Sequence, residues 1–518
     1  MCNKISVVED KIVFFAEAFC SKRKEPRHKA LRAASRLATK PSDLNKRQIF
    51  DRASNRKPYA DGVNMPFSLY KRKDGEEQPH WKCGPFKLRL PLVHYKLEMV
   101  EAVQALVLFV VGLAMIPWLQ KHLGLPFEAA LAYTFVCNFA WLIPTFLGVP
   151  FVPGWITAGI PIIIMNLSQY GPGPDAIKAL VAIQIMVAAI FIILGITKLS
   201  SKIVTNIPIS IKAGILIGAG MAAFMGEIKV GGRLSQDPIS IGIAALICFY
   251  MLFSLSFQRL KGKYKIAAQI SKYGMVPAML VAIAIGVAVG EFPAPNIEFG
   301  ITKPDFALMW QYLPWTIGFP EWQFYVNGFA TAVAAYIIAF GDVIVGSSLV
   351  ENANKESRSD EIVDTCADRI HLATGIRNAI HALFAPYIGL AGPIYTAVTA
   401  TVADRYRNGR QAMESIYSGA GTFWLVGLFA MFMLPLVTFF KPFLPISLSL
   451  TMFVTGYLCL VDGFKEAKDP IQAGVACTMG VVLATHGAAY GIGVGILFHL
   501  LLERKFQSRK PAEEGMPA

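Results

Sequence analysis

Charged residues are scarce in this sequence. Only 16% of its 518 residues are Asp, Glu, Lys or Arg, whereas 54% are hydrophobic and the mean hydropathy is positive. A soluble domain usually carries about 25% charged residues. The composition therefore excludes an ordinary soluble protein for most of the chain, and we expect that part to be solvated by lipid.

Cysteine is also sparse and has no metal-binding pattern. Eight cysteines are scattered along the chain and none follows C-x-x-C spacing, which argues against a metal cluster or a disulfide framework. A secretory signal is missing as well, because the apolar run at residues 12–15 is too short. We expect no metal and no cofactor, and we interpret residues 1–95 as a basic cytoplasmic N-terminal extension.

The net charge of +14 is concentrated near the N-terminus. Residues 1–96 contain 22 Lys and Arg against 10 Asp and Glu, and the rest of the chain is almost neutral. Basic residues beside a membrane span report orientation and attract anionic lipids. No nucleic-acid motif stands out, so we expect membrane lipids as partners and no nucleic acid. The basic cluster at residues 22–36 fits a helix on the lipid headgroups or a solvated tail.

Apolar runs that suit membrane spans of about 20 residues occur seven times in each half of the chain, counting two short, interrupted ones. The first half has them at residues 97–119, 127–148, 151–168, 175–198, 207–226, 236–256 and 274–291. The second half has them at residues 323–350, 370–388, 392–404, 415–438, 443–461, 470–486 and 488–503. The sequence predicts an all-α polytopic membrane protein with 14 transmembrane segments in two inverted seven-span repeats.

The repeats and their flanks have predicted bounds. Repeat 1 covers residues 96–292, an extracytoplasmic loop covers 293–322, repeat 2 covers 323–505, and a cytoplasmic tail covers 506–518. Basic residues cluster after the sixth, tenth and fourteenth spans, whereas Lys303 is the only one in 292–322. This distribution places both termini in the cytoplasm. We expect a multi-pass protein of the cell (inner or cytoplasmic) membrane.

Two short motifs interrupt the apolar runs at matching places. Val152-Pro153-Gly154 precedes Ile207-Pro208 by 55 residues, and Gly392-Pro393 precedes Leu444-Pro445 by 52 residues, counted between the prolines. Interrupted spans at corresponding places in two repeats point to a transporter's binding site, although Pro and Gly are also common in ordinary membrane helices. The predicted substrate-binding residues here are Gly154, Trp155, Ile156, Thr157, Pro393, Ile394, Tyr395 and Thr396.

These motifs predict two broken helices, the third and the tenth spans, whose ends meet in the bilayer. Helix N-termini carry unpaired N–H groups and positive partial charge, which bind anionic or carbonyl oxygens. Trp155 and Tyr395 each lie two residues after a proline. Their positions suit either of two roles: side chains that form the wall of a substrate site, or aromatic anchors at the membrane interface.

Asp342 is a carboxylate inside an apolar span. Placing it at the bilayer centre costs about 2.5–3.5 kcal/mol, so a functional task is expected. We assign Gly341 and Asp342 to the substrate site and Asp342 to ion coupling by H⁺ or Na⁺, with a structural carboxylate near the cytoplasmic mouth as the alternative. Gln104 in the first span is a further candidate, unless it forms a helix–helix hydrogen bond.

The segment from Gly341 to Glu351 is similar to the eighth span of sulfate permeases, which places an acidic residue where Asp342 stands. The order of Gly375-Ile376-Arg377-Asn378, the broken tenth span and Asn408-Gly409-Arg410 also follows that family. Residues 97–505 thus resemble the superfamily of sulfate permeases, bicarbonate carriers and nucleobase–ascorbate permeases. Three features depart from the family and indicate a divergent member: no arginine in the tenth half-helix, no glutamate in residues 393–400, and no regulatory domain after Arg504.

The resemblance implies a secondary active transporter of a small anion or organic acid, with elevator-like movement of spans 1–4 and 8–11 against spans 5–7 and 12–14. The alternative function is a nucleobase permease for uracil or xanthine. The assembly that we consider is a homodimer. We expect no enzyme. An intramembrane aspartyl protease needs a second carboxylate facing Asp342, whereas Asp404 and Asp462 are placed at span ends.

Overall fold

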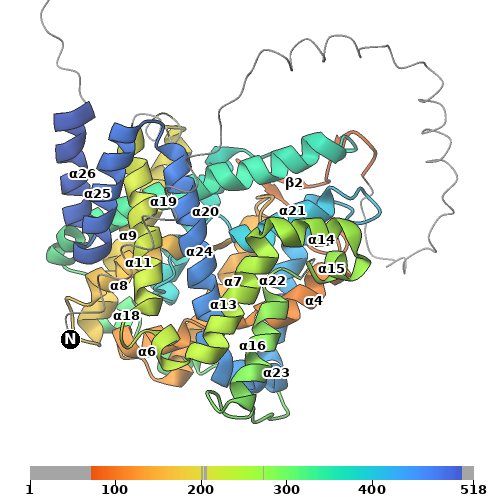
Figure 1. The fold of residues 1–518 in the computed structure, drawn as a ribbon, viewed down its shortest axis with the longest axis horizontal. Coiled ribbons are helices and arrows are strands. Elements are labelled where there is room, and N and C mark those ends of the chain that lie inside the picture. The colour runs from red at the N-terminus through yellow and green to blue at the C-terminus, as the bar shows by residue number, and fades with distance from the viewer. Residues whose placement is uncertain (1–71, 200–201, 203–206, 272, 504–518) are drawn as a thin grey trace, which may run out of the picture. The chain divides into compact units, whose positions relative to one another are not determined.

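The computed structural model describes residues 72–199, 202, 207–271 and 273–503, without the side chains of residues 110 and 111. The basic cluster at 22–36 and the tail at 506–518 lie outside these residues. Helices dominate the described part (Figure 1).

Every predicted span of the first half corresponds to one helix or a run of consecutive helices. They are α4 (Met99–Leu108), α5 (Val110–Leu113) and α6 (Ile116–Leu123) for the first span, then α7 (Phe127–Phe146), α8 (Ile160–Leu167), α9 (Pro174–Thr197), α11 (Ile209–Ile228), α13 (Pro238–Phe253) and α16 (Val276–Ala288). Shorter helices connect them: α12 (Arg233–Gln236), α14 (Leu255–Lys263) and α15 (Lys265–Ser271). The first span is divided into three pieces, and Pro117 lies in the first turn of the last one, where the missing N–H of proline is tolerated.

The second half repeats this pattern. Its helices are α19 (Trp322–Ser357), α20 (Ala367–Phe384), α21 (Thr396–Tyr406), α22 (Ile416–Phe432), α23 (Leu434–Phe440), α24 (Leu444–Glu466), α25 (Pro470–His486) and α26 (Ala488–Phe498), the last continued by η4 (His499–Glu503). The predicted loop at 293–322 contains α17 (Phe306–Trp310) and α18 (Pro314–Ile317).

Five helical stretches among the described residues are long and apolar enough to cross a membrane. They are α7, α9, residues 209–236, α19 and residues 434–466. Two bent pairs, α13 with α14 at 66° and α15 with α16 at 87°, raise the number to seven if each pair is one span. The structure therefore supports a polytopic helical protein, and the count of 14 spans stays a prediction.

The main helix contacts fall into two groups. The first helix group comprises α4–α9 and α19–α23: α9 packs on α19 and α20, and α22 packs on α4 and α7. The second helix group comprises α11–α16 and α24–α26: α11 packs on α24 and α25, and α13 packs on α16 and α24. Each group draws helices from both halves of the chain.

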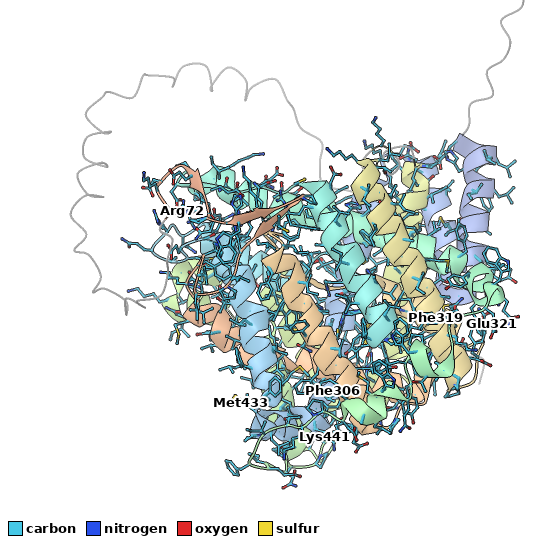
Figure 2. The ribbon with its side chains drawn as sticks, turned by 180° about the vertical axis from the view of Figure 1, so that it is seen from behind. Arg72, Phe306, Phe319, Glu321, Met433 and Lys441 are labelled. Atoms are coloured by element: carbon cyan, nitrogen blue, oxygen red, sulfur yellow. The ribbon has the colours of Figure 1, made fainter. Side chains whose placement is uncertain are left out.

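Residues 72–98 form a strap over one end of the first helix group, a feature that the sequence did not predict. In it, β1 (Glu76–Glu77) pairs in parallel with β5 (Glu361–Ile362), and β2 (Trp81–Cys83) pairs antiparallel with β3 (Phe86–Leu88). Figure 2 shows Arg72 in this strap at the opposite end of the helices from Met433 and Lys441.

Ion pairs fix the strap to the loop that follows α19 and to Arg405 in the last turn of α21, and Arg358 joins that loop to the loop after α21. The Arg72 guanidinium donates to the Asp360 carboxylate at 2.7 Å, and Arg405 donates to Glu98 at 2.8 Å and also to Glu101. The fully buried Arg358 donates to the Met413 and Glu414 carbonyls at 3.0 and 2.8 Å. The strap and these two loops therefore lie at the end that the basic residues predict to be cytoplasmic.

Candidate functional site

The two interrupted segments cross each other and pair as short antiparallel strands. These are β4 (Gly154–Trp155) and β6 (Ala391–Gly392), in which Gly154 is opposite Gly392 and Trp155 is opposite Ala391. Two further hydrogen bonds extend the pair: the Ile156 N–H donates to the Leu390 carbonyl at 3.0 Å, and the Tyr395 N–H donates to the Val152 carbonyl at 2.6 Å. The predicted meeting of the third and tenth spans is therefore present.

Glycine is required at this crossing because the backbones touch. A Cβ atom at Gly392 would lie 2.5 Å from the Trp155 carbonyl group, and one at Gly154 would lie 2.8 Å from the Ile394 carbonyl oxygen. Any side chain would push the strands apart. The glycines of the two motifs thus permit the approach that brings the two half-helices together.

Side chains of neighbouring helices hold the crossing from behind. Arg377 on α20 donates to the Gly392 carbonyl at 2.7 Å and to the Gly154 carbonyl at 3.0 Å. Asn378 exchanges two hydrogen bonds with the Ala391 backbone, and the Trp424 indole on α22 donates to the Pro153 carbonyl at 2.6 Å. These donors satisfy carbonyl groups that a broken helix leaves unpaired.

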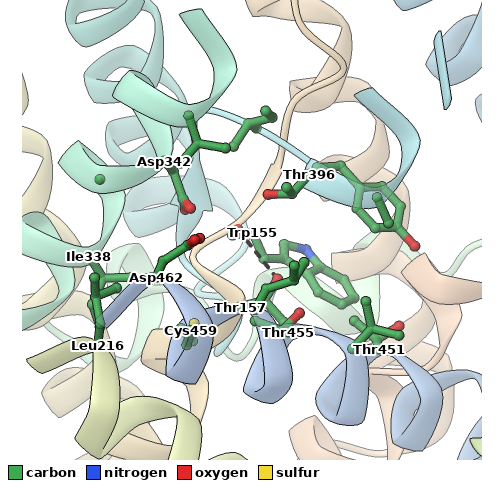
Figure 3. A pocket seen from close by; sticks show the side chains of 18 of the residues that line it. Trp155, Thr157, Leu216, Ile338, Asp342, Thr396, Thr451, Thr455, Cys459 and Asp462 are labelled. Atoms are coloured by element: carbon green, nitrogen blue, oxygen red, sulfur yellow. Dashed lines mark hydrogen bonds between the residues drawn. The ribbon is translucent and has the colours of Figure 1, made fainter. Parts of the chain in front are cut away.

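A cavity of 210 Å³ lies beside the crossing, with the starts of both half-helices in its wall (Figure 3). The first half-helix begins with η2 (Thr157–Gly159) and continues as α8, and the second is α21, which begins at Thr396. The lining of the cavity includes Trp155, Thr157, Asp342, Ile394, Tyr395, Thr396, Thr451, Thr455, Cys459, Asp462, Lys465 and Glu466.

Two aspartates from different helices reach this cavity. Asp342 comes from α19 and Asp462 from α24, and Figure 3 shows both carboxylates directed into the space between these helices. Lys465 contacts Asp462 at 3.3 Å. Asp462 was predicted to lie at a span end, and no second carboxylate was expected to face Asp342. The first prediction is correct. The second is wrong, because α24 extends to Glu466 and its last turns line the same cavity as Asp342.

Aromatic rings wall the cavity on the side of the crossing. The Tyr395 ring stacks on Trp424 with centroids 6.4 Å apart and an angle of 22°, and Trp155 lies 5.5 Å from Trp141 and 5.9 Å from Tyr387. Trp155 is only 4% exposed, so it is not an anchor at the membrane surface. The cavity wall is therefore rigid and largely apolar on this side.

The predicted site residues divide into three sets. Trp155, Thr157, Gly341, Asp342, Ile394, Tyr395 and Thr396 line the cavity. Gly154 lines a 10 Å³ hollow next to it, together with Trp141 and Trp424. Ile156 and Pro393 belong to the crossing but line neither space, and Gln104 is buried on α4 away from both.

The polar face of α24 is the part of the site that sequence reasoning missed. Thr451, Thr455, Cys459 and Asp462 follow one another at spacings of four, four and three residues and all line the cavity. Such spacing places side chains on one helical face. A polar stripe on an apolar helix was therefore the signal available in the sequence.

A second cavity of 680 Å³ lies at the opposite end of α11 and α24, between the two helix groups. Arg233 lies in its wall and donates to the Glu227 carboxylate and, at 2.9 Å, to the Ser449 hydroxyl. The same guanidinium lies 4.9 Å from the centre of the Trp118 ring on α6. Arg233 thus joins two helices of the second group to one of the first.

Metal binding has no support in the part of the chain that the structure describes, because no three His, Cys, Asp or Glu side chains come together there. The chemistry of the central cavity is that of backbone N–H groups, hydroxyls and carboxylates.

Comparison with known proteins gives distant structural similarity. No protein-family model matches the chain, and no curated protein matches it. One similar solved structure is SLC26A9, with 15% identity and a TM-score of 0.46; the match covers 78% of this chain and 64% of that one. A second is the transmembrane domain of a cyanobacterial bicarbonate transporter, BicA, with 17% identity and a TM-score of 0.46; the match covers 77% of this chain and 96% of that one. A third is murine Slc26a9 in the inward-facing state, with 14% identity and a TM-score of 0.44; the match covers 88% of this chain and 74% of that one. This chain therefore spans less than two thirds of the first of these. Similarity of this degree says nothing about the substrate.

Proposed function

We propose that this protein is a secondary active transporter that moves a small anion or organic acid together with H⁺ or Na⁺. The observation that carries the proposal is the crossing of β4 and β6, which brings the starts of two half-helices and Asp342 to one cavity. Paired, interrupted segments of this kind are the mark of a transport site at the middle of a membrane.

The helix starts suit an anion. The first N–H groups of a helix have no partner within it and carry positive partial charge. Thr157 and Thr396 lie at these starts and add hydroxyl donors to the same wall. A carboxylate or an inorganic oxyanion can therefore be bound without a basic side chain that touches it.

The carboxylates in the cavity supply the reason for coupling. Asp342, Asp462 and Glu466 line it, with Lys465 as the one basic side chain among the described lining residues. An anion that enters is repelled unless a carboxylate is neutralised by a proton or paired with a sodium ion. Asp342 is the best placed of the three, because it lies within an apolar helix and has no basic partner among the described residues.

The division into two helix groups supports an elevator-like movement. The crossing belongs to the first group, in which Arg377 and Trp424 tie both half-helices to α20 and α22. The opposite wall of the cavity comes from α24 of the second group. A shift of one group against the other would carry the bound anion along the face of α24.

The test is uptake by the purified protein in liposomes, with chloride, bicarbonate, sulfate or succinate outside and a proton or sodium gradient imposed. Asp342→Asn removes the ionisable group with little change of shape, and we expect gradient-driven uptake to fall by at least about tenfold. The matched control is Asp404→Asn, because the Asp404 side chain on α21 is 61% exposed. We expect this variant to keep the uptake of the wild-type protein. Full coupled uptake by Asp342→Asn would contradict the role of Asp342.

The same assay separates the anion from the heterocyclic alternative. Uracil and xanthine are added as competitors at concentrations above that of the labelled anion. We expect no inhibition by either compound. Inhibition by a nucleobase, with no uptake of any of the four anions, would refute the proposal and favour a nucleobase permease.

A further inference from the structure

Arg377 is a buried cation without a counter-ion. Its side chain is fully buried on α20, and among the described residues no carboxylate forms an ion pair with it. Its two terminal nitrogens donate to the carbonyl groups of Gly392 and Gly154, and its Nε has no hydrogen-bond partner. Burying an unpaired charge is costly, so its retention at this point requires a reason.

Among the described residues, the groups that interact with Arg377 include no carboxylate. His381, one turn along α20, is also fully buried, and neither of its ring nitrogens has a partner. Cys137 on α7 is close enough to Arg377 for electrostatic interaction and is likewise buried. In the described structure, the guanidinium is therefore buried without a carboxylate beside it.

The substrate cavity lies across one layer of backbone from this charge. The carbonyl groups of Gly154 and Gly392 accept from Arg377. Trp155, next to Gly154, and Ile394, two residues after Gly392, line the cavity. Gly154 itself lines the small hollow beside it. The guanidinium thus lies behind the strand pair and does not reach the cavity.

We propose that Arg377 is a positioning residue that makes the central cavity selective for anions: it holds both crossing strands and supplies positive potential through them. This inference rests on the proposed function and deepens it. The lining side chains alone carry three carboxylates against one lysine, so they favour cations. Behind the crossing, Arg377 supplies a buried charge of the opposite sign that forms no ion pair with a described residue. In a medium of low polarity, its effect on an anion one backbone layer away is about 10- to 30-fold in affinity.

The decisive experiment neutralises the charge and keeps the arginine. Cys137→Asp places a carboxylate near the guanidinium, and Cys137→Asn is the matched control of the same size without charge. With whichever of chloride, bicarbonate, sulfate and succinate the wild-type protein transports, we expect Cys137→Asp to raise the KM for the anion by about tenfold or more. Cys137→Asn should remain within about twofold of wild type. Equal KM values for the two variants would overturn the inference.

A second pair of variants keeps the inference testable if Cys137→Asp does not fold, as judged by size-exclusion chromatography. Arg377→Lys retains the charge but loses the planar fork, whereas Arg377→Gln loses the charge and retains a donor. We expect Lys to rescue anion selectivity over a neutral analogue and Gln to lose it. Equal selectivity in both would mean that Arg377 has a structural role only. A wild-type protein that transports none of the four anions would refute the proposed function itself, whereas transport that is insensitive to the charge would refute the inference alone.

Discussion

Gly392 leaves no room for a side chain at the centre of the site. A Cβ atom there would lie 2.5 Å from the carbon and oxygen of the Trp155 carbonyl group and 2.7 Å from the Ile156 nitrogen. Backbone atoms cannot move aside as the end of a flexible side chain can. The strands would have to separate, and the hydrogen bonds on either side of the contact would lengthen with them.

We therefore predict that Gly392→Ala lowers the stability of the protein by about 1–3 kcal/mol and abolishes uptake. The measurement is the thermal unfolding midpoint in detergent, together with transport in liposomes. Gly474→Ala is the control, because nothing lies within 4 Å of the Cβ position at this helical glycine of α25. Unchanged transport by Gly392→Ala would show that the crossing tolerates separation.

Some residues of the site could be predicted from the sequence and others could not. Trp155, Tyr395 and Asp342 were predictable because local signals mark them: a proline two positions earlier, or a charge in an apolar run. Asp462 was named only as a residue at a span end, and Arg377 only within a motif that resembles the family, because their places beside the cavity depend on partners that are far away in the sequence. Asp462 lines the same cavity as Asp342 of α19. Arg377 donates to the carbonyl groups of Gly154, 223 residues before it, and of Gly392, 15 residues after it.

At the scale of elements, helices were predicted well and short strands were not. Period and length of the apolar runs decide where a helix forms, and each run coincides with one helix or with consecutive helices. The pairs β1–β5 and β4–β6 join segments hundreds of residues apart and are only two residues long. No local sequence pattern predicts strands of that length, because they form only where tertiary contacts bring the two segments together.

The strap of residues 72–98 is an element whose attachment depends on ionised carboxylates. Asp364 accepts from Lys87 at 2.6 Å and from Arg369 at 3.0 Å. Burial alone would raise the pKa of Asp364, but the hydrogen bonds and charges of these two residues outweigh it and hold the pKa at about 2, below the usual 3.8. A lowered carboxyl pKa stabilises the folded state above the usual pKa, and the stabilisation is lost as the pH falls toward 2.

Asp364→Asn should therefore destabilise the protein at pH 7 by about 1 kcal/mol, after allowance for partial exposure to solvent. The difference between wild type and variant should shrink as the pH is lowered from 4 toward 2. Thermal midpoints recorded across this range check the sign. Asp404→Asn, on the exposed side of α21, is the control and should show a small difference at every pH. A gap that widens in acid would contradict the assigned ion pairs.

For the molecule as a whole, the two cavities lie at opposite ends of the same pair of helices. Lys465 lines the central cavity near the end of α24 and is 71% exposed, whereas the exposed Lys229 lines the second cavity just after the end of α11. In the predicted topology, the end of α24 near Lys465 faces the cytoplasm, and the end of α11 near Lys229 faces outward. The central site would then be open to the inside only.

This arrangement can be tested by labelling. In a background without cysteine, Lys465→Cys should react with a membrane-impermeant maleimide only from the cytoplasmic side, and Lys229→Cys only from the outside. Sealed right-side-out and inside-out vesicles give the two directions. Reaction of both positions from the same side would refute the inverted arrangement of the two repeats.

The strand pair at the centre also constrains how this protein can evolve. Each crossing strand supplies hydrogen-bond partners for the other, and each glycine is fitted to backbone from the other half of the chain. A backbone change in one strand must therefore be matched in the other. Most of the chain is free of this constraint, but at Gly154 and Gly392 the two strands have to change together or not at all.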